Sequence, residues 1–254
     1  MMIVSTGFAF NDEHSESKYV TKIRIQGGLI QDSFLANRSV DAVRLRNSYK
    51  TQLRTIEREP LVIPMALYFD ENLTEENIRI VKRWLDTDDY KSLRFDEDPG
   101  RIYYAIVDGA STLSHNAISS GYVEFDMLTN SPYSFSDIIE VEGSSTSTQE
   151  REIRLHNDGD LEVSPKIEVV MNSKLAGTIN ITNETIGQHL VIENNLANET
   201  VTILNEYEEI HTTSTLQNKY SNHNGAFISL TPGENVLKFK GMYTFKLSFQ
   251  SIYK

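Results

Sequence analysis

The chain has 254 residues, enough for one or two domains, and 39% hydrophobic with 24% charged residues indicates a globular protein. Its net charge of −12 disfavours a role that grips nucleic acid or anionic lipid, because such binding needs a local surplus of Lys and Arg. The absence of cysteine excludes disulfides, thiolate nucleophiles and cysteine-based zinc sites.

The amino-terminal segment, MMIVSTGFAFNDEHS, lacks a basic start followed by a long apolar run. No window of the chain approaches the ~18 apolar residues of a membrane-spanning helix. We therefore expect neither a signal peptide nor a membrane span.

The first half of the chain predicts strands around a polar and basic excursion. The apolar runs are KIRIQGGLI from Lys22, LVIPMALYF from Leu61, RIYYAIV from Arg101 and GYVEFDML from Gly121. Between the first two runs, residues from about 32 to 60 predict a projecting hairpin or arm.

One sharply defined helix is predicted after Thr74. Thr74 is a good N-cap, and Glu75 and Glu76 place negative charge in the first turn. An apolar stripe then follows at helical spacing, so we expect one face of the helix to be buried in the core of the amino-terminal domain. The residues of this candidate structural core are Ile78, Val81, Trp84 and Leu85.

A domain boundary is predicted at EGSSTSTQE, where five small hydroxyl residues follow a glycine. This gives an amino-terminal domain over residues 1–142, a linker over 143–150 and a carboxy-terminal domain over 151–254. The alternative is a surface loop within a single domain.

Beyond that boundary, short apolar runs recur at regular spacing with turn sequences between them. In YTFKLSF the aromatic and aliphatic residues alternate with Thr, Lys and Ser, as in a half-buried strand. The pattern predicts an antiparallel β-sandwich. The chain as a whole is therefore expected to be mostly β, with one flanking α-helix in the first domain.

No stretch of the sequence carries a recognisable catalytic or metal-binding motif. Ser114 and His115 are adjacent on a predicted strand, where their side chains point apart, and the six histidines show no metal-ligand spacing. The acidic clusters do not match a calcium loop. We therefore expect no catalytic residues, no metal, no cofactor and no enzymatic activity.

The charges of the first domain are unevenly divided. Residues 21–62 hold eight Lys/Arg against four Asp/Glu, whereas residues 70–98 hold ten Asp/Glu against five Lys/Arg. Opposite patches permit head-to-tail self-association, although they also fit two solvated faces of a monomer. The candidate self-assembly contacts are Arg38, Arg44, Arg46, Arg54, Arg58, Asp88, Asp89, Asp96, Glu97 and Asp98.

The run ENIRIVKRWLDTDDYKSLRFDEDPGRIYYAIVDG resembles the amino-terminal domain of distal tail proteins (Dit) of long-tailed, siphovirus-type phages. GYVEFDMLTNSPYSFS resembles the closing strand of that domain. LHNDGDLEVSPKIEV and LTPGENVLKFKG resemble the family's carboxy-terminal galectin-like sandwich. The resemblance implies a tail-tube-like β-sandwich with a flanking helix, followed by a galectin-like β-sandwich.

The resemblance also implies a function: a hexameric ring that joins the tail tube to the adsorption apparatus or baseplate, at the tail tip of a virion assembled in the host cytoplasm. The implied partners are other copies of the chain, the tail-tube protein and a tail-tip or tail-associated protein, with a receptor-binding protein as a further candidate. DNA would pass through the ring without specific binding. A carbohydrate-binding adhesin module is the alternative, because the second sandwich has the architecture of sugar-binding domains.

Overall fold

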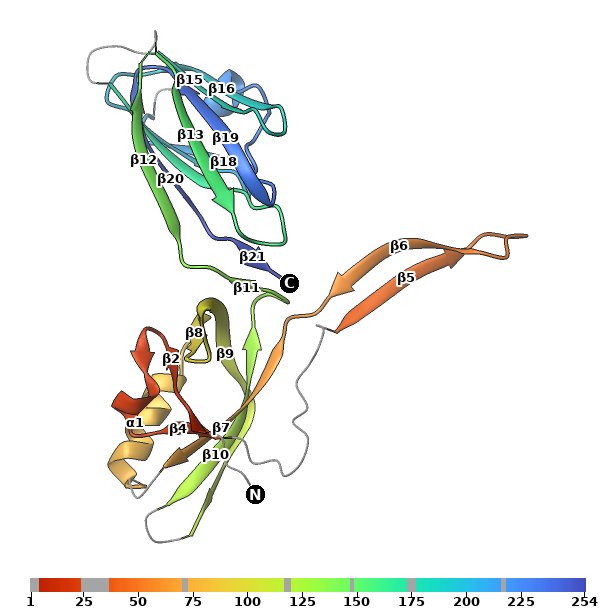
Figure 1. Ribbon diagram of the computed structural model, residues 1–254, viewed down its shortest axis with the longest axis vertical. Coiled ribbons are helices and arrows are strands. Elements are labelled where there is room, and N and C mark those ends of the chain that lie inside the picture. Colours follow the sequence, from red (N-terminus) through yellow and green to blue (C-terminus); the bar gives the residue numbers. More distant parts are fainter. Residues whose placement is uncertain are drawn as a thin grey trace. The chain divides into compact units, whose positions relative to one another are not determined.

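Figure 1 shows the computed structural model, which describes residues 5–23, 37–69, 73–116, 120–146, 149–172, 177–215 and 218–254. The chain divides into two compact units, Met1–Ser134 and Phe135–Lys254. Strands predominate in both units, and α1 is the one α-helix within the described ranges. The expected mostly β fold with a single helix is confirmed.

The amino-terminal unit is built on one antiparallel sheet with the strand order β1-β4-β7-β10-β9-β8-β2-β3. Pro64 pairs with Asp126 of β10 and lies beyond the short register that joins β7 to β4, so at this position β7 has a described partner strand on one side only, as is usual for proline in a strand. The elements are β1 Ser5–Thr6, β2 Phe8–Phe10, β3 Glu13–His14, the 3-10 helix η1 Ser15–Lys18, β4 Thr21–Ile23, β7 Val62–Phe69, β8 Lys91–Phe95, β9 Asp98–His115 and β10 Gly121–Thr129.

Helix α1, Glu75–Leu85, packs on this sheet. The Thr74 hydroxyl accepts a hydrogen bond from the Asn77 N–H at 3.1 Å, which is the cap that the sequence indicates. Val81, Trp84 and Leu85 are buried, and the partly buried Ile78 packs against the same core. The stripe therefore forms the contact between the helix and the sheet.

Trp84 joins the helix to strand β2. Its indole Nε1–H donates a hydrogen bond of 2.8 Å to the Phe10 carbonyl oxygen. Its ring stacks on Phe8 with 5.4 Å between centroids and meets Phe10 edge-on at 6.0 Å. The polar atom of a buried aromatic is thus satisfied while its ring fills the core.

The basic excursion forms a separate two-stranded sheet, β5 Arg38–Arg44 and β6 Thr51–Arg58. The strands are antiparallel, with an irregular register between Asp41 and Ala42. Residues 32–36 of the expected arm lie outside the described residues. Figure 1 shows the two strands as a long hairpin that leads into β7.

The carboxy-terminal unit is a sandwich of two antiparallel sheets, β12-β20-β14-β17-β18 and β13-β19-β15-β16. Phe239 of β19 stacks on Phe245 of β20 with 3.7 Å between ring centroids, so the two sheets meet in one core. The elements are β12 Ile139–Ser145, β13 Arg151–Asn157, β14 Lys166–Met171, β15 Gly177–Asn183, β16 Gln188–Asn195, β17 Thr200–Leu204, β18 Glu209–Thr212, the 3-10 helix η2 Lys219–Asn222, β19 Gly233–Lys240 and β20 Tyr243–Phe249, with the short β11 Ser134–Phe135 and β21 Ile252–Tyr253.

The division between the units differs from the one expected from composition. It falls after Ser134, whereas the segment proposed as a linker, residues 143–150, begins inside β12. Gly143 is paired with Phe245, and a Cβ placed on it would lie 2.7 Å from the Phe245 ring. The Ser145 hydroxyl donates to the Gly241 carbonyl at 2.8 Å. Small residues stand here because the strand packs closely on β20.

Candidate assembly surface

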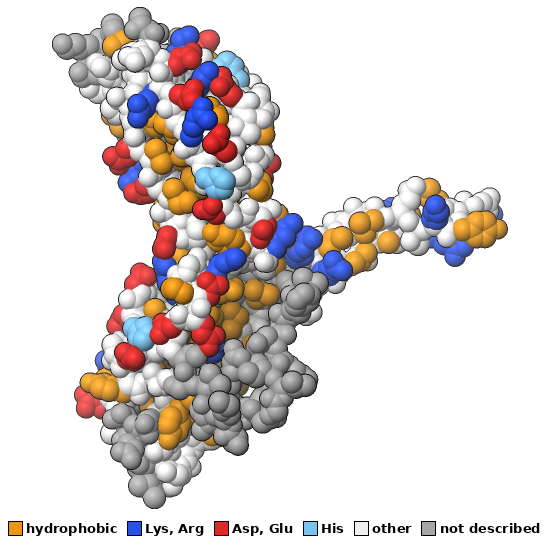
Figure 2. Space-filling model, viewed as in Figure 1, with side chains coloured by type: hydrophobic (Ala, Val, Ile, Leu, Met, Phe, Trp, Pro, Cys, Tyr) orange, Lys and Arg blue, Asp and Glu red, His pale blue; other side chains and the backbone are white. Residues whose placement is uncertain are grey.

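All five candidate arginines are exposed and belong to the β5–β6 hairpin or its turn. Arg38 is directly opposite Arg58 in the antiparallel register, an arrangement of like charges that destabilises a strand pair unless an anion lies nearby. At the far end, Arg44 Nε donates to the Ser48 carbonyl at 2.8 Å and so rigidifies the turn. The hairpin therefore presents cations at both of its ends, as Figure 2 shows.

The hairpin's charge is opposite to that of the remaining chain. Residues 37–60 contain six Lys/Arg and three Asp/Glu, which is a net charge of +3. Because the whole chain has a net charge of −12, all other residues together carry −15. The hairpin is thus a basic segment in an otherwise acidic chain.

One face of the hairpin is apolar along its middle. Val40 is opposite Ile56 and Ala42 is opposite Leu53, so these four side chains share a face. Val40 is 57% exposed and Leu53 is 58% exposed, because a two-stranded sheet has no second layer to cover it. We call these four residues the apolar strip; the hydrophobic side chains of the hairpin are visible in Figure 2.

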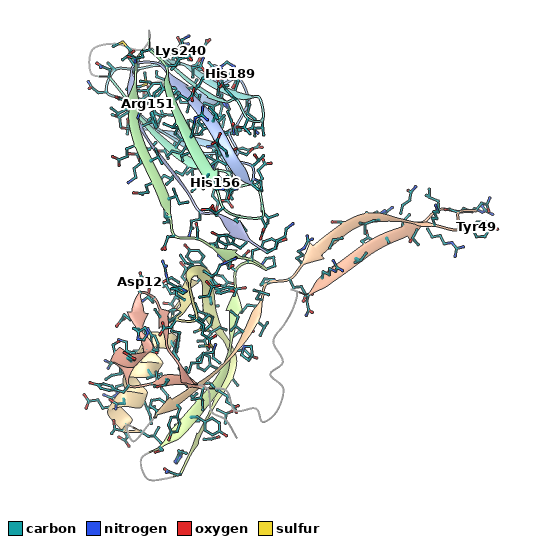
Figure 3. The ribbon with its side chains drawn as sticks, viewed as in Figure 1. Asp12, Tyr49, Arg151, His156, His189 and Lys240 are labelled. Carbon is teal, nitrogen blue, oxygen red and sulfur yellow. The ribbon has the colours of Figure 1, made fainter. Side chains whose placement is uncertain are left out.

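Tyr49 lies at the far end of the hairpin (Figure 3) and is 97% exposed. Leu45, in the same turn, is half exposed. A large aromatic side chain with almost no contact to its own unit is typical of a residue that contacts another molecule.

The five candidate acidic residues are also exposed, but they are not equally available. Asp88 and Asp89 follow the end of α1, and Asp89 accepts a hydrogen bond from the Tyr90 N–H at 2.8 Å. Asp96 lies 3.1 Å from Nε2 of His14, and Asp98 lies 3.8 Å from Nε of Arg101. Part of the acidic stretch is therefore engaged within its own unit, and the contact between His14 and Asp96 joins residues too far apart in the sequence for the sequence alone to indicate it.

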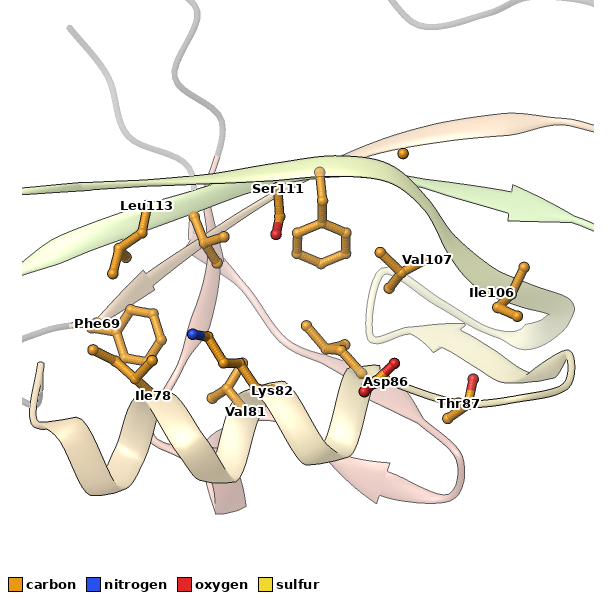
Figure 4. A pocket seen from close by; sticks show the side chains of 14 residues that line it. Phe69, Ile78, Val81, Lys82, Asp86, Thr87, Ile106, Val107, Ser111 and Leu113 are labelled. Carbon is orange, nitrogen blue, oxygen red and sulfur yellow. The ribbon is translucent and has the colours of Figure 1, made fainter.

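A groove of about 480 Å³ lies beside the contact between α1 and the sheet, as Figure 4 shows from close by. Its walls are mainly apolar, with Ile78 and Leu85 on the helix and Leu113, Val123 and Phe125 on β9 and β10. Lys82 and Ser111 add polar groups to the lining, and Asp86 and Thr87 line it at the carboxyl end of the helix. The unit thus carries a mainly apolar groove, with a lysine on the helix side and a carboxylate at one end.

The described ranges contain no group of three or more His, Cys, Asp or Glu residues placed to hold a metal ion. Within the same ranges, no helix has the length and apolar character needed to span a membrane.

Two family models cover nearly the whole chain. One, described as a phage tail protein N-terminal domain, matches residues 3–131, and the other, a phage tail C-terminal domain, matches residues 133–250. The chain belongs to this family of phage tail proteins. The junction between the two matches lies beside the division between Ser134 and Phe135.

A relative of this phage tail protein occurs in a prophage. The SPbeta prophage-derived uncharacterized protein YomH of Bacillus subtilis (strain 168) is 28% identical over 255 residues, which cover 100% of both chains.

Solved structures of phage adsorption proteins share the fold. The Dit protein (gp 19.1) of phage SPP1, described as a paradigm of the hub adsorption apparatus in phages that infect Gram-positive bacteria, superposes with a TM-score of 0.68 at 14% identity. That match covers 96% of this chain and 98% of the other. A chain of the phage P2 baseplate in its activated conformation with Ca matches with a TM-score of 0.53 at 8% identity, with the same coverage. The chain therefore has the Dit fold across both units.

Proposed function

We propose that this phage tail protein is the hub of a tail tip, where six copies form a ring that joins the tail tube to the adsorption apparatus or baseplate. The observation that carries the proposal is the β5–β6 hairpin, whose apolar strip is uncovered and whose basic charge opposes the rest of the chain. The shared fold with the SPP1 hub protein supports the role, and the number six comes from the resemblance to the Dit family.

In the proposed ring, the hairpin of one copy reaches the neighbouring copy. Burial of the apolar strip supplies most of the affinity, because exposed ion pairs contribute only ~0–1 kcal/mol each. The arginines select the register and the direction of approach by facing carboxylates of the neighbour. Asp88 and Asp89 are the favoured counterparts, because both are exposed and follow shortly after Asp86 at the carboxyl end of α1.

The groove beside α1 is the favoured acceptor for the apolar strip. Its lining is mainly apolar, with Lys82 on the helix side, and Asp86 stands at one end where an arginine of the hairpin can pair with it. A head-to-tail contact of this kind uses two different surfaces of each copy and closes a ring when the rotation permits.

The remaining parts of the proposal concern partners and place. One face of the ring would contact the tail-tube protein, and the other a tail-tip or tail-associated protein and a receptor-binding protein. DNA would pass through the ring without specific binding, at the tail tip of a virion assembled in the host cytoplasm. The role requires no catalysis, and no described feature favours the carbohydrate-binding alternative.

Light scattering coupled to size-exclusion chromatography tests the ring. We expect the full-length chain to elute with the mass of six copies at low salt. A variant in which residues 40–55 are replaced by a short Gly-Ser turn should remain folded and monomeric. A monomeric full-length chain at high concentration and low salt would overturn the proposed assembly, and the shortened variant shows whether any oligomer depends on the hairpin.

A further inference from the structure

The carboxy-terminal unit buries a charged pair beside an amide. The side chains of Lys219 and Glu199 are each 1% exposed, and Asn195 is fully buried next to them. Fully buried Lys and Glu side chains are rare, because removing both charges from water costs several kcal/mol per ion. A sandwich that already has an extensive apolar core does not need this pair for packing, so its chemistry is of interest.

The three groups are in direct contact. Lys219 Nζ donates to Glu199 Oε2 at 2.8 Å and to Asn195 Oδ1 at 3.1 Å. It also lies 3.5 Å from the Asn194 carbonyl oxygen. An amine, a side-chain amide and a carboxylate therefore meet in one site from which water is excluded.

Each partner of the lysine is held in place. The Asn195 amide nitrogen donates to the carbonyls of Ile192 at 2.7 Å and Gly177 at 3.0 Å, which fixes the orientation of the amide. Glu199 accepts from the Leu196 N–H at 2.7 Å and from the Thr212 hydroxyl. The Asn195 carbonyl oxygen and the Glu199 carboxylate are thus both held in contact with the lysine amine.

We propose that Lys219 and Asn195 join in an intramolecular isopeptide bond and that Glu199 relays the proton for this reaction. The bond would connect the end of β16 to the start of η2. It would be a covalent modification of the folded protein, independent of the ring proposed above.

The reaction begins with a proton transfer inside the buried pair. Burial raises the pKa of Glu199, but hydrogen bonds from Lys219, Thr212 and the Leu196 N–H outweigh it and lower that pKa, so the resting state is the ion pair. Because burial disfavours both charges, the proton of the ammonium can move to the carboxylate and leave two neutral groups. The neutral amine of Lys219 is then the nucleophile.

The bond changes balance without a co-reactant. Nζ attacks Cγ of Asn195, a C–N bond forms, and a tetrahedral intermediate results. The protonated Glu199 gives its proton to Nδ2 of Asn195 and then accepts a proton from Nζ. The bond from Cγ to Nδ2 breaks, and Nδ2 leaves as ammonia. One amine and one primary amide give one secondary amide and one ammonia molecule. Fixed proximity in a dry site is what makes this slow chemistry accessible.

The cross-link would enclose residues 195–219, which contain the β17–β18 pair of strands. Closing such a loop covalently restricts the unfolded chain, as a disulfide does. The chain has no cysteine, so an amide cross-link would be its means of covalent stabilisation.

Intact-mass spectrometry of the purified full-length protein tests the proposal. We expect a mass below the sequence value by one ammonia molecule, and a branched peptide that joins the segments containing Lys219 and Asn195. Lys219→Met and Asn195→Ala should have the masses of their sequences. Most of the Glu199→Gln protein should have the full mass of its sequence. Lys166→Met is the control, because it removes an exposed lysine; its mass should be lower than its sequence value by one ammonia molecule, as for the wild type.

Two results would overturn the proposal. One is a folded wild-type protein, verified by circular dichroism, with the full sequence mass after prolonged incubation. The other is an ammonia loss that persists in Lys219→Met, because Asn224–Gly225 can lose ammonia by succinimide formation. Peptide mapping places the loss at one site or the other. Since the main readout is made on the wild type, a variant that fails to fold does not affect the conclusion.

Discussion

Replacing Trp84 with alanine should strongly destabilise the amino-terminal unit. The side chain is buried, stacks on Phe8 and donates its indole N–H to the Phe10 carbonyl at 2.8 Å. Removing a buried Trp side chain typically costs about 3–5 kcal/mol. The upper part of that range applies here, because the substitution removes both the packing of the ring and the hydrogen bond to the Phe10 carbonyl.

Two matched variants separate these contributions. Trp84→Phe keeps an aromatic ring in the core and removes the hydrogen bond, so we expect a loss of about 1–2 kcal/mol. Arg79 lies on the exposed face of the same helix, so Arg79→Ala should change the free energy of unfolding by less than about 0.5 kcal/mol. Urea unfolding followed by circular dichroism measures all three.

In the wild type, the fluorescence of Trp84, the single tryptophan, should be blue-shifted and should report unfolding of this unit alone. A loss below about 1 kcal/mol for Trp84→Ala, or a wild-type emission like that of indole in water, would refute the placement of the helix.

Four further outcomes are expected. Replacing Arg44, Arg46 and Arg54 with Glu should leave the monomer folded and prevent ring formation at low salt, as measured by light scattering. If this variant still formed hexamers, the proposed contact between these arginines and the neighbour's carboxylates would be wrong. Gly143→Val should cost about 1–3 kcal/mol in thermal unfolding, because a branched side chain there meets the Phe245 ring. Separately expressed residues 135–254 should fold, whereas residues 151–254 should unfold at lower urea because β20 loses its partner β12. Purified protein should release no product from cell-wall polymers; reproducible turnover abolished by one Asp or Glu substitution would contradict this.

Features that depend on neighbours in sequence were predictable. The helix begins at the cap that Thr74 provides, and its buried stripe follows from a spacing of three to four residues. Strand β20 likewise has its aromatic and aliphatic side chains inside and Thr244 outside, as the alternation predicts. In both cases a local period reports directly which side faces the core.

Features that depend on distant partners were not predictable. Gly143 to Ser145 look like linker residues because the side chain that needs their small size, Phe245, lies far along the chain. The buried asparagines give the same lesson. Asn183 and Asn235 are fully buried and bonded to each other at 3.3 Å, although asparagine usually marks a surface turn. Pairing across the sheet decides these positions, and local composition does not reveal it.

The hairpin's own marginal stability bears on how assembly would proceed. An isolated two-stranded sheet is barely stable in water, and opposition of Arg38 to Arg58 weakens this one further. A neighbouring copy would cover the apolar strip and place carboxylates beside the arginines, so the contact that closes the ring would also stabilise the hairpin. Part of the binding free energy is then used to order the hairpin, which lowers the affinity of a single contact. A closed ring makes every hairpin–neighbour contact at once, and it should therefore be far more stable than an open dimer.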